Sequence, residues 1–143
     1  MEPSVVKKAL AAAVRAKSIP QLECYSYSPH APTVPAFTIG EVSINPHETF
    51  RGMETYDVTC SVLTSTADDE AGQELLDKLL AKSGTYSVRE ALLDARGAPG
   101  ELALDGAADD LSIERIDGYR MLAYAGQDST YYGADITVRV IGD

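Results

Sequence analysis

The sequence predicts an α+β fold in which helices pack on one side of an antiparallel β-sheet. Residues 56–64 alternate apolar and polar side chains, a pattern typical of a half-buried antiparallel strand. Two other segments, within residues 4–20 and 66–84, repeat apolar side chains at helical spacing. Strands and helices that follow each other in blocks favour the α+β class. The length of 143 residues fits one domain, residues 1–143.

The first predicted helix is amphipathic. Val6, Leu10 and Val14 recur every fourth residue, with Ala13 and Lys17 beside them. We expect Ser4 to cap the start of this helix. The pair Ile19-Pro20 is expected to stop it, because the residue before a proline avoids helical angles.

Three strands are expected next. Short extended runs at Cys24–Tyr27 and Val34–Gly40 are separated by prolines, and residues 41–53 are predicted to form a long link. The third strand is the clearest in the sequence. Its inward face is expected to hold Tyr56, Val58, Cys60, Val62 and Thr64.

A second helix is expected to begin at Thr66 or Asp68 and to end at Ser83-Gly84. Its predicted buried stripe consists of Ala71, Leu75, Leu76, Leu79 and Leu80. Ser87-Val88-Arg89-Glu90 has the capping-box pattern and predicts a third, shorter helix through Leu93.

The C-terminal part predicts a loop followed by three strands. Residues 95–108 are rich in Ala and Gly and are interpreted as the loop. The strands are expected at Leu111–Asp117, Arg120–Ala125 and Tyr131–Ile141, and residues 126–129 are expected to form a hairpin turn between the last two.

Net charge and hydropathy exclude several classes of partner. The chain has 22 acidic and 12 basic residues, a formal charge of -10, which disfavours binding to nucleic acid or to an anionic membrane. No run approaches the ~18 apolar residues of a membrane span. The first residues lack a signal-peptide pattern, so we expect synthesis in the cytoplasm, without a membrane role.

Motifs for catalysis or metal binding are weak throughout. Cys24 and Cys60 are expected to be small buried residues on strands; a disulfide or a reactive thiol is the alternative. His30 and His47 have no ligand spacing. The acidic group 105–110 departs from a calcium loop, and no nucleophile elbow or phosphate loop occurs. We therefore expect no catalytic residue, cofactor or metal, and a non-enzymatic protein.

Candidate interface residues occur in two places. The link holds Phe50, Arg51 and Met53, residue types enriched at protein interfaces, without a periodicity that would bury them. Alternatively, Phe50 and Met53 fold back over the sheet. Tyr131 and Tyr132 are candidates because tyrosine offers rigid amphipathic area, although ordinary strand tyrosines explain them too.

An ordered series of stretches resembles bacteriophage tail terminator proteins, in the version found in phages of actinobacteria. The series covers nearly the whole chain and consists of Ser18-Ile19-Pro20 after the first helix, Tyr25 and Tyr27, Val34–Phe37, Phe50–Tyr56, Ala67–Asp69, Ser83-Gly84, Ser87–Arg89, Arg115–Tyr124, Tyr132–Asp135 and Val138–Gly142. Residues 102–110 fit the family pattern least well.

This resemblance implies an assembly role rather than chemistry. Such proteins form a ring, usually a hexamer, that caps the head-proximal end of the tail tube and ends its polymerisation. The implied partners are other copies of the chain, the tail tube protein and the head–tail connector or stopper protein, with DNA only as passing cargo. The implied location is the virion tail or neck, after assembly in the host cytoplasm. The alternatives are another neck or tail-tube protein, or a small cytoplasmic ligand-binding domain or enzyme.

Overall fold

The computed structural model describes residues 2–29, 32–46, 53–65, 69–97, 100–123 and 130–142. The helices are α1 (Pro3–Ala16), α2 (Asp69–Leu80) and α3 (Val88–Asp94), with a short 3-10 helix, η1 (Leu104–Gly106). The strands are β1 (Glu23–Cys24), β2 (Ala36–Asn45), β3 (Glu54–Thr64), β4 (Asp110–Ala123) and β5 (Thr130–Gly142).

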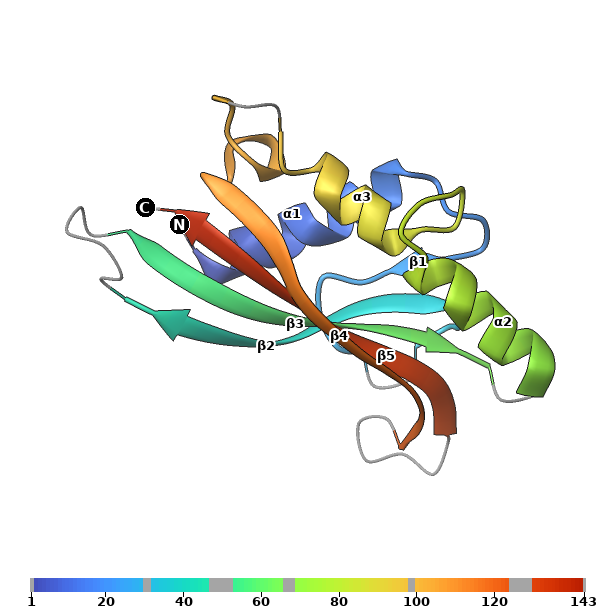
Figure 1. Ribbon diagram of the computed structural model, residues 1–143. Helices are drawn as coiled ribbons and strands as arrows, with labels where there is room; N and C mark the ends of the chain where they lie inside the picture. The colour runs from blue at the N-terminus through green and yellow to red at the C-terminus, as the bar shows by residue number, and fades with distance from the viewer. Residues whose placement is uncertain are drawn as a thin grey trace.

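The strands form one sheet in the order β1-β2-β3-β5-β4, and the helices lie on one side of it (Figure 1). This arrangement confirms the predicted α+β class with helices on one side. The four long strands pair antiparallel, as expected. The two-residue β1 pairs parallel with β2, at Glu23↔Ala36 and Cys24↔Phe37, which makes the sheet mixed.

The hydrophobic core lies between the sheet and the helices. The predicted inward face of β3 is buried along its length, from Tyr56 to Thr64. On β5, Ile136, Val138 and Val140 are fully buried and pair with this row. α1 covers them with Val6, Leu10 and Val14, as its periodicity predicted.

β4 is one long strand, so the prediction of separate strands at Leu111–Asp117 and Arg120–Ala125 was wrong. The pairing with β5 shifts between Ile113 and Arg115 and again between Asp117 and Arg120, which marks two bulges. A bulge inserts one unpaired residue and changes the alternation of faces without ending the strand. The predicted hairpin of β4 and β5 is confirmed by Ala123↔Thr130; its turn lies outside the described residues.

β2 is longer than expected and replaces the first part of the predicted link. Pairing with β3 shifts between Ile39 and Val42 and then continues to Asn45↔Thr55. The bulge at residues 40–41 interrupts the alternation, which is why the sequence predicted an end at Gly40. A long β2–β3 hairpin results, whose remaining connection, residues 47–52, is outside the described part.

The helix ends differ from the expectations in detail. α1 begins at Pro3, because proline needs no N–H partner at the first helical position, so Ser4 lies inside the helix rather than capping it. α1 ends at Ala16, before the predicted stop. In the first turn of α2, Gly72 is buried, whereas Ala71, which was predicted to be buried, is exposed. Ser87 caps α3 as predicted, with its Oγ accepting from the Glu90 N–H at 3.0 Å.

The predicted loop before β4 folds against the core. Ala103 and Ala108, on either side of η1, pair as an isolated antiparallel β-bridge. Both residues are buried, as is Leu104. The Leu104 N–H donates to the Ala95 carbonyl at 2.7 Å, which ties the segment to the end of α3. Residues 100–108 therefore form a folded flap beside α1 rather than an open loop.

Candidate assembly surfaces

Burial raises the pKa of both thiols of this chain. Cys60 on β3 is fully buried, and burial raises the pKa of its thiol to about 12. Cys24 at the end of β1 is half-buried, and burial raises its pKa as well, against a smaller opposing effect of Arg15. Both cysteines are free. A nucleophilic cysteine needs a stabilised thiolate, which neither position provides.

Asp110, the first residue of β4, is held in an ion pair. The Arg96 guanidinium contacts Asp110 at 2.8 Å and holds the pKa of that carboxyl below its usual range. No cluster of three or more potential metal ligands occurs within the described residues. His30 and His47 lie outside them, so the predictions for these histidines stay open. The same described part contains no helix long and apolar enough to cross a membrane.

The structure separates the candidate interface residues rather than gathering them. Met53 is half-buried just before β3, while Phe50 and Arg51 lie outside the described residues. Tyr131 is half-buried on β5. Because Glu54 pairs with Gly142 and Thr64 with Tyr132, Met53 and Tyr131 lie at opposite ends of the β3–β5 ladder. That separation is roughly 35 Å for strands of this length.

Tyr132 belongs to the core in the isolated chain. Its side chain is only 8% exposed and lies in the hydrophobic cluster. Its ring packs against Gly72 of α2, where an added Cβ would come within 3.1 Å of Tyr132 Cδ2. Tyr132 therefore offers a partner little surface, whereas Tyr131, its neighbour, remains accessible.

Two open sheet edges are the main feature that the sequence did not reveal. β4 is the last strand of the sheet and pairs only with β5 among the described residues. At the other side, the outer half of β2, residues 41–45, pairs only with β3 within the described chain. Open edges offer rows of backbone donors and acceptors to another strand. These edges face in opposite directions (Figure 1).

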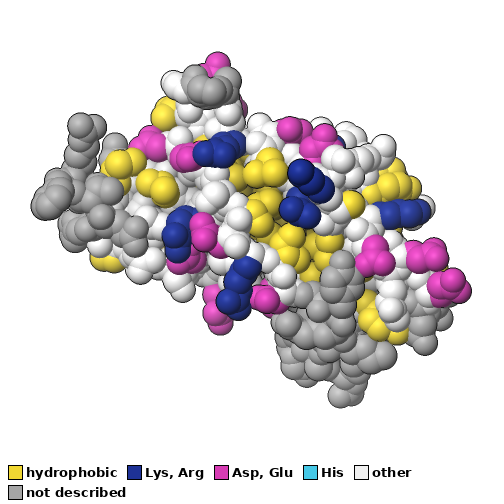
Figure 2. All heavy atoms as spheres, viewed as in Figure 1, with side chains coloured by type: hydrophobic (Ala, Val, Ile, Leu, Met, Phe, Trp, Pro, Cys, Tyr) yellow, Lys and Arg dark blue, Asp and Glu magenta, His cyan; other side chains and the backbone are white. Residues whose placement is uncertain are grey.

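The two open edges differ in how far they limit indiscriminate pairing. β4 has two bulges and an ion pair, Arg115 Nε to Asp117 Oδ2 at 2.8 Å, and both features discourage random strand addition. On the β2 edge, Ile44 is 46% exposed and pairs with the buried Tyr56. Figure 2 shows a hydrophobic patch among charged side chains where α3 and β4 meet. The β4 edge is therefore protected against random pairing, whereas the β2 edge presents an apolar side chain to a partner.

The face of the sheet opposite the helices is polar. Ser61 Oγ donates to Asp135 Oδ1 at 2.8 Å, and Arg139 Nε lies 3.1 Å from Asp57 Oδ1. These pairs link β3 to β5 across the ladder. No helix of the described chain covers this face (Figure 1).

Sequence signals for the β2 edge existed but were ambiguous. Val42 and Ile44 alternate with polar residues, as expected of a strand that continues beyond Gly40. The bulge at 40–41 shifts their phase relative to Ile39, so a strict two-residue period fails there. The open edges themselves follow from strand order, which no local pattern specifies.

Comparison with known proteins leaves the family open. No protein-family model matches the chain, and no curated protein matches it either. The resemblance to tail terminator proteins therefore rests on the ordered series of residues in the sequence.

Proposed function

We propose that this protein is a structural subunit of a long-tailed bacteriophage that closes into a ring on the head-proximal end of the tail tube. In this role it ends tube polymerisation and offers the surface to which the head connector or stopper protein docks. The protein acts in the virion tail or neck after assembly in the host cytoplasm. It performs no chemistry and needs no cofactor. The order of residue patterns along the chain supports this assignment.

One structural observation carries the proposal: the sheet has two different open edges, residues 41–45 of β2 and the length of β4. When one edge of a subunit meets the other edge of the next, the contact is head-to-tail. Such a contact generates a closed ring if its rotation sums to a full turn and a filament if it does not. A hexamer is the ring size that the resemblance implies.

The charge of the chain fits the passage of DNA through such a ring. Proteins gain affinity for DNA when their Lys and Arg side chains release counterions from the phosphates. A chain with a formal charge of -10 gains little in this way, so DNA can pass through the ring without being bound. The same charge opposes self-association of free subunits, which keeps them soluble until they reach the tube. The tube protein and the connector therefore remain the proposed partners, and DNA only a passing cargo.

A tail-tube or other neck subunit is the alternative that the same edges favour. A tube subunit repeats a contact along the tube without limit, whereas a terminator adds one ring. The distinction lies in the product of assembly. An enzyme or ligand-binding domain is less well supported, because both cysteines have raised pKa values and Asp110 is ion-paired with Arg96.

An edge-directed variant tests the proposal. Ile44→Glu places a charge on the open β2 edge at a side chain that is 46% exposed, so folding stability should change by no more than ~0.5 kcal/mol. Ring formation or tube capping should weaken by about tenfold or more, as for a central interface residue. Leu93→Glu on α3 is the matched control, since it adds the same charge at a side chain that is 43% exposed and lies outside the β2 edge.

Mass by light scattering across concentration and salt, with electron microscopy of tubes, measures the outcome. The proposal expects a discrete ring for the wild type and the Leu93→Glu variant and loss of the ring for Ile44→Glu. Filaments that lengthen with concentration would identify a tube protein instead. Equal weakening by both variants would show that net charge, not the β2 edge, controls assembly.

A further inference from the structure

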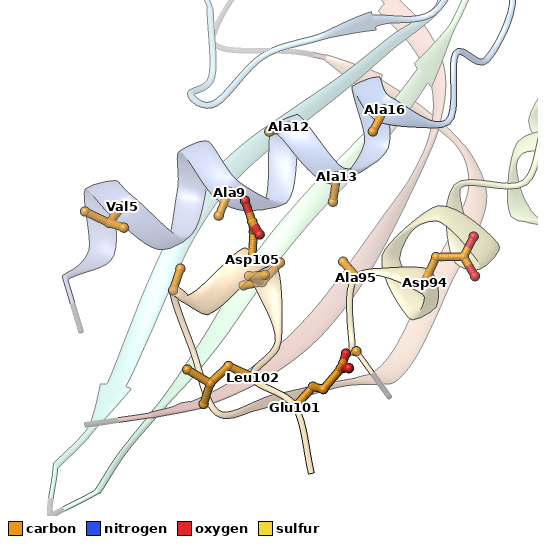
Figure 3. Close-up of a pocket in the computed structure, with 13 residues that line it drawn as sticks. Val5, Ala9, Ala12, Ala13, Ala16, Asp94, Ala95, Glu101, Leu102 and Asp105 are labelled. Atoms are coloured by element: carbon orange, nitrogen blue, oxygen red, sulfur yellow. The ribbon is translucent and has the colours of Figure 1, made fainter. Parts of the chain in front are cut away.

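A groove runs along the outer side of α1, away from the sheet. One wall is a row of α1 residues from Val5 to Ala16, and the other is the flap 100–108 with the end of α3 (Figure 3). Its volume is about 700 Å³. None of the described residues that line it belongs to a strand, so the groove is distinct from the open sheet edges.

The floor of the groove is apolar and partly exposed. α1 has a second apolar stripe, distinct from its core stripe, formed by Val5, Ala9, Ala12, Ala13 and Ala16. Five large apolar side chains of the described chain are more than two-fifths exposed, and two of them, Val5 at 47% and Leu102 at 56%, line this one groove. Exposed apolar side chains gathered in one concave surface indicate a binding site.

The rim of the groove is acidic. Among the described residues that line the groove, Asp94, Glu101 and Asp105 are the charged ones, and none is basic. Asp105 projects toward Ala9 on α1 from the opposite wall (Figure 3). Nearby Asp110 and Glu90 are neutralised by Arg96 and Lys17, whereas Asp94 and Asp105 form no ion pair within the described chain. The groove thus combines an apolar floor with an acidic rim.

The flap that carries this rim is held in a specific shape. Leu104 and Asp105 both have positive φ, 53° and 54°, a conformation that side-chain-bearing residues rarely adopt. The Leu104 side chain is 4% exposed, and its N–H bonds to Ala95, so the core fixes this turn. Packing therefore places the Asp105 carboxylate at the groove instead of leaving it to sample many positions.

We propose that this groove binds a basic amphipathic helix of a partner protein, with its apolar face on α1 and its Lys or Arg side chains on Asp94 and Asp105. The alanine floor lets a second helix approach closely. From Val5 to Ala16 the floor extends about 16 Å, three helical turns, which matches anchors at i, i+3 or i+4, and i+7.

Helical geometry suits the groove better than an extended segment. An added strand needs an open sheet edge for its backbone, and the described lining of the groove contains no strand residue. A helix satisfies its own backbone hydrogen bonds. A second copy of the chain is disfavoured as occupant, because each copy carries a formal charge of -10. The inference does not depend on the proposed ring, which uses the sheet edges.

The test uses the full chain and a synthetic helical peptide with a Leu stripe flanked by Lys. Two controls are a peptide with Glu in place of Lys and a scrambled peptide of the same composition. Binding by calorimetry should require the basic amphipathic peptide. Amide NMR shifts should map to α1 and the flap. A small cationic amphiphile, dodecyltrimethylammonium, that binds as tightly as the peptide would identify a small-molecule pocket and overturn the proposal.

Charge-neutral variants localise the interaction. Asp94→Asn with Asp105→Asn should weaken binding about three- to tenfold, the effect of losing two partly exposed charge pairs; asparagine also tolerates the positive φ at residue 105. Ala12→Arg, at an exposed floor position, should abolish binding. Glu74→Gln on α2 removes one exposed charge outside the groove and should leave binding unchanged. Equal affinity in the double variant and the wild type would refute the proposal.

Discussion

The ring of Tyr132 on β5 packs directly over Gly72 on α2. A Cβ at residue 72 would lie 3.1 Å from Tyr132 Cδ2 and would collide with the Ser65 carbonyl oxygen. Thr64 Oγ1 donates to the Gly72 carbonyl at 2.9 Å, which draws the helix onto β3. The glycine is therefore needed for the close approach of α2 to the sheet, not for an unusual backbone angle.

We predict that Gly72→Ala lowers the free energy of unfolding by about 2 kcal/mol, because overpacking against backbone costs more than the helix propensity gained. Urea denaturation measures the change. Gln73→Ala, at the exposed neighbouring position, should stay within ~0.5 kcal/mol of the wild type. A Gly72→Ala protein as stable as the wild type would mean that α2 does not pack this closely.

Glu90 couples α3 to α1 and makes stability depend on pH. The Gly84 N–H, 2.9 Å from Glu90 Oε2, and the Lys17 ammonium, 3.2 Å away, hold the pKa of this carboxyl below its usual value of 4.5. A carboxyl with a lowered folded-state pKa stabilises the fold above its unfolded pKa, and this contribution is lost as pH falls through the folded pKa.

We therefore expect Glu90→Gln to lower the melting temperature near neutral pH and to approach the wild type below about pH 4. The amide oxygen of glutamine can still accept from Gly84, so the variant removes mainly the charge. Glu74→Gln, without a partner of this kind in the described chain, should melt like the wild type throughout. A constant difference across the pH range would argue against the charge as the cause.

Phe50 tests the predicted contact arm. If the arm is an interface, Phe50→Ala should leave thermal stability nearly unchanged while tails become irregular in length because capping fails. If Phe50 folds into the core, the same change should cost ~3–5 kcal/mol of stability. Melting of the variant and tail lengths by electron microscopy separate these outcomes, and a large drop in melting temperature would end the arm hypothesis.

Binding of duplex DNA should be very weak. With a formal charge of -10, the isolated protein should not bind more tightly than the ~10⁻⁴ M edge of non-specific affinity at physiological salt. Fluorescence anisotropy of a labelled duplex measures this. Micromolar affinity that falls steeply with salt would contradict the idea that DNA slides past the ring.

Local patterns in the sequence determined the elements whose causes are local. The alternation from Tyr56 to Thr64 requires one buried face, and β3 has it. Ser87 and Glu90 stand three residues apart, so the Ser87 hydroxyl can cap the Glu90 N–H at the start of α3. This interaction is local and does not depend on where the helix packs. The α+β class follows from the same kind of information, because periodicities and their order are properties of short stretches.

Only the tertiary structure decided where strands continue and which surfaces remain open. Gly118 and Gly40 suggested strand ends, yet β5 and β3 pair beyond them because a bulge lets a partner strand continue the ladder. Burial of Leu104 and Ala108 turned an apparent loop into the wall of a groove. Strand order, and with it the open edges of β2 and β4, depends on contacts between residues far apart in the chain, and no local periodicity encodes those contacts.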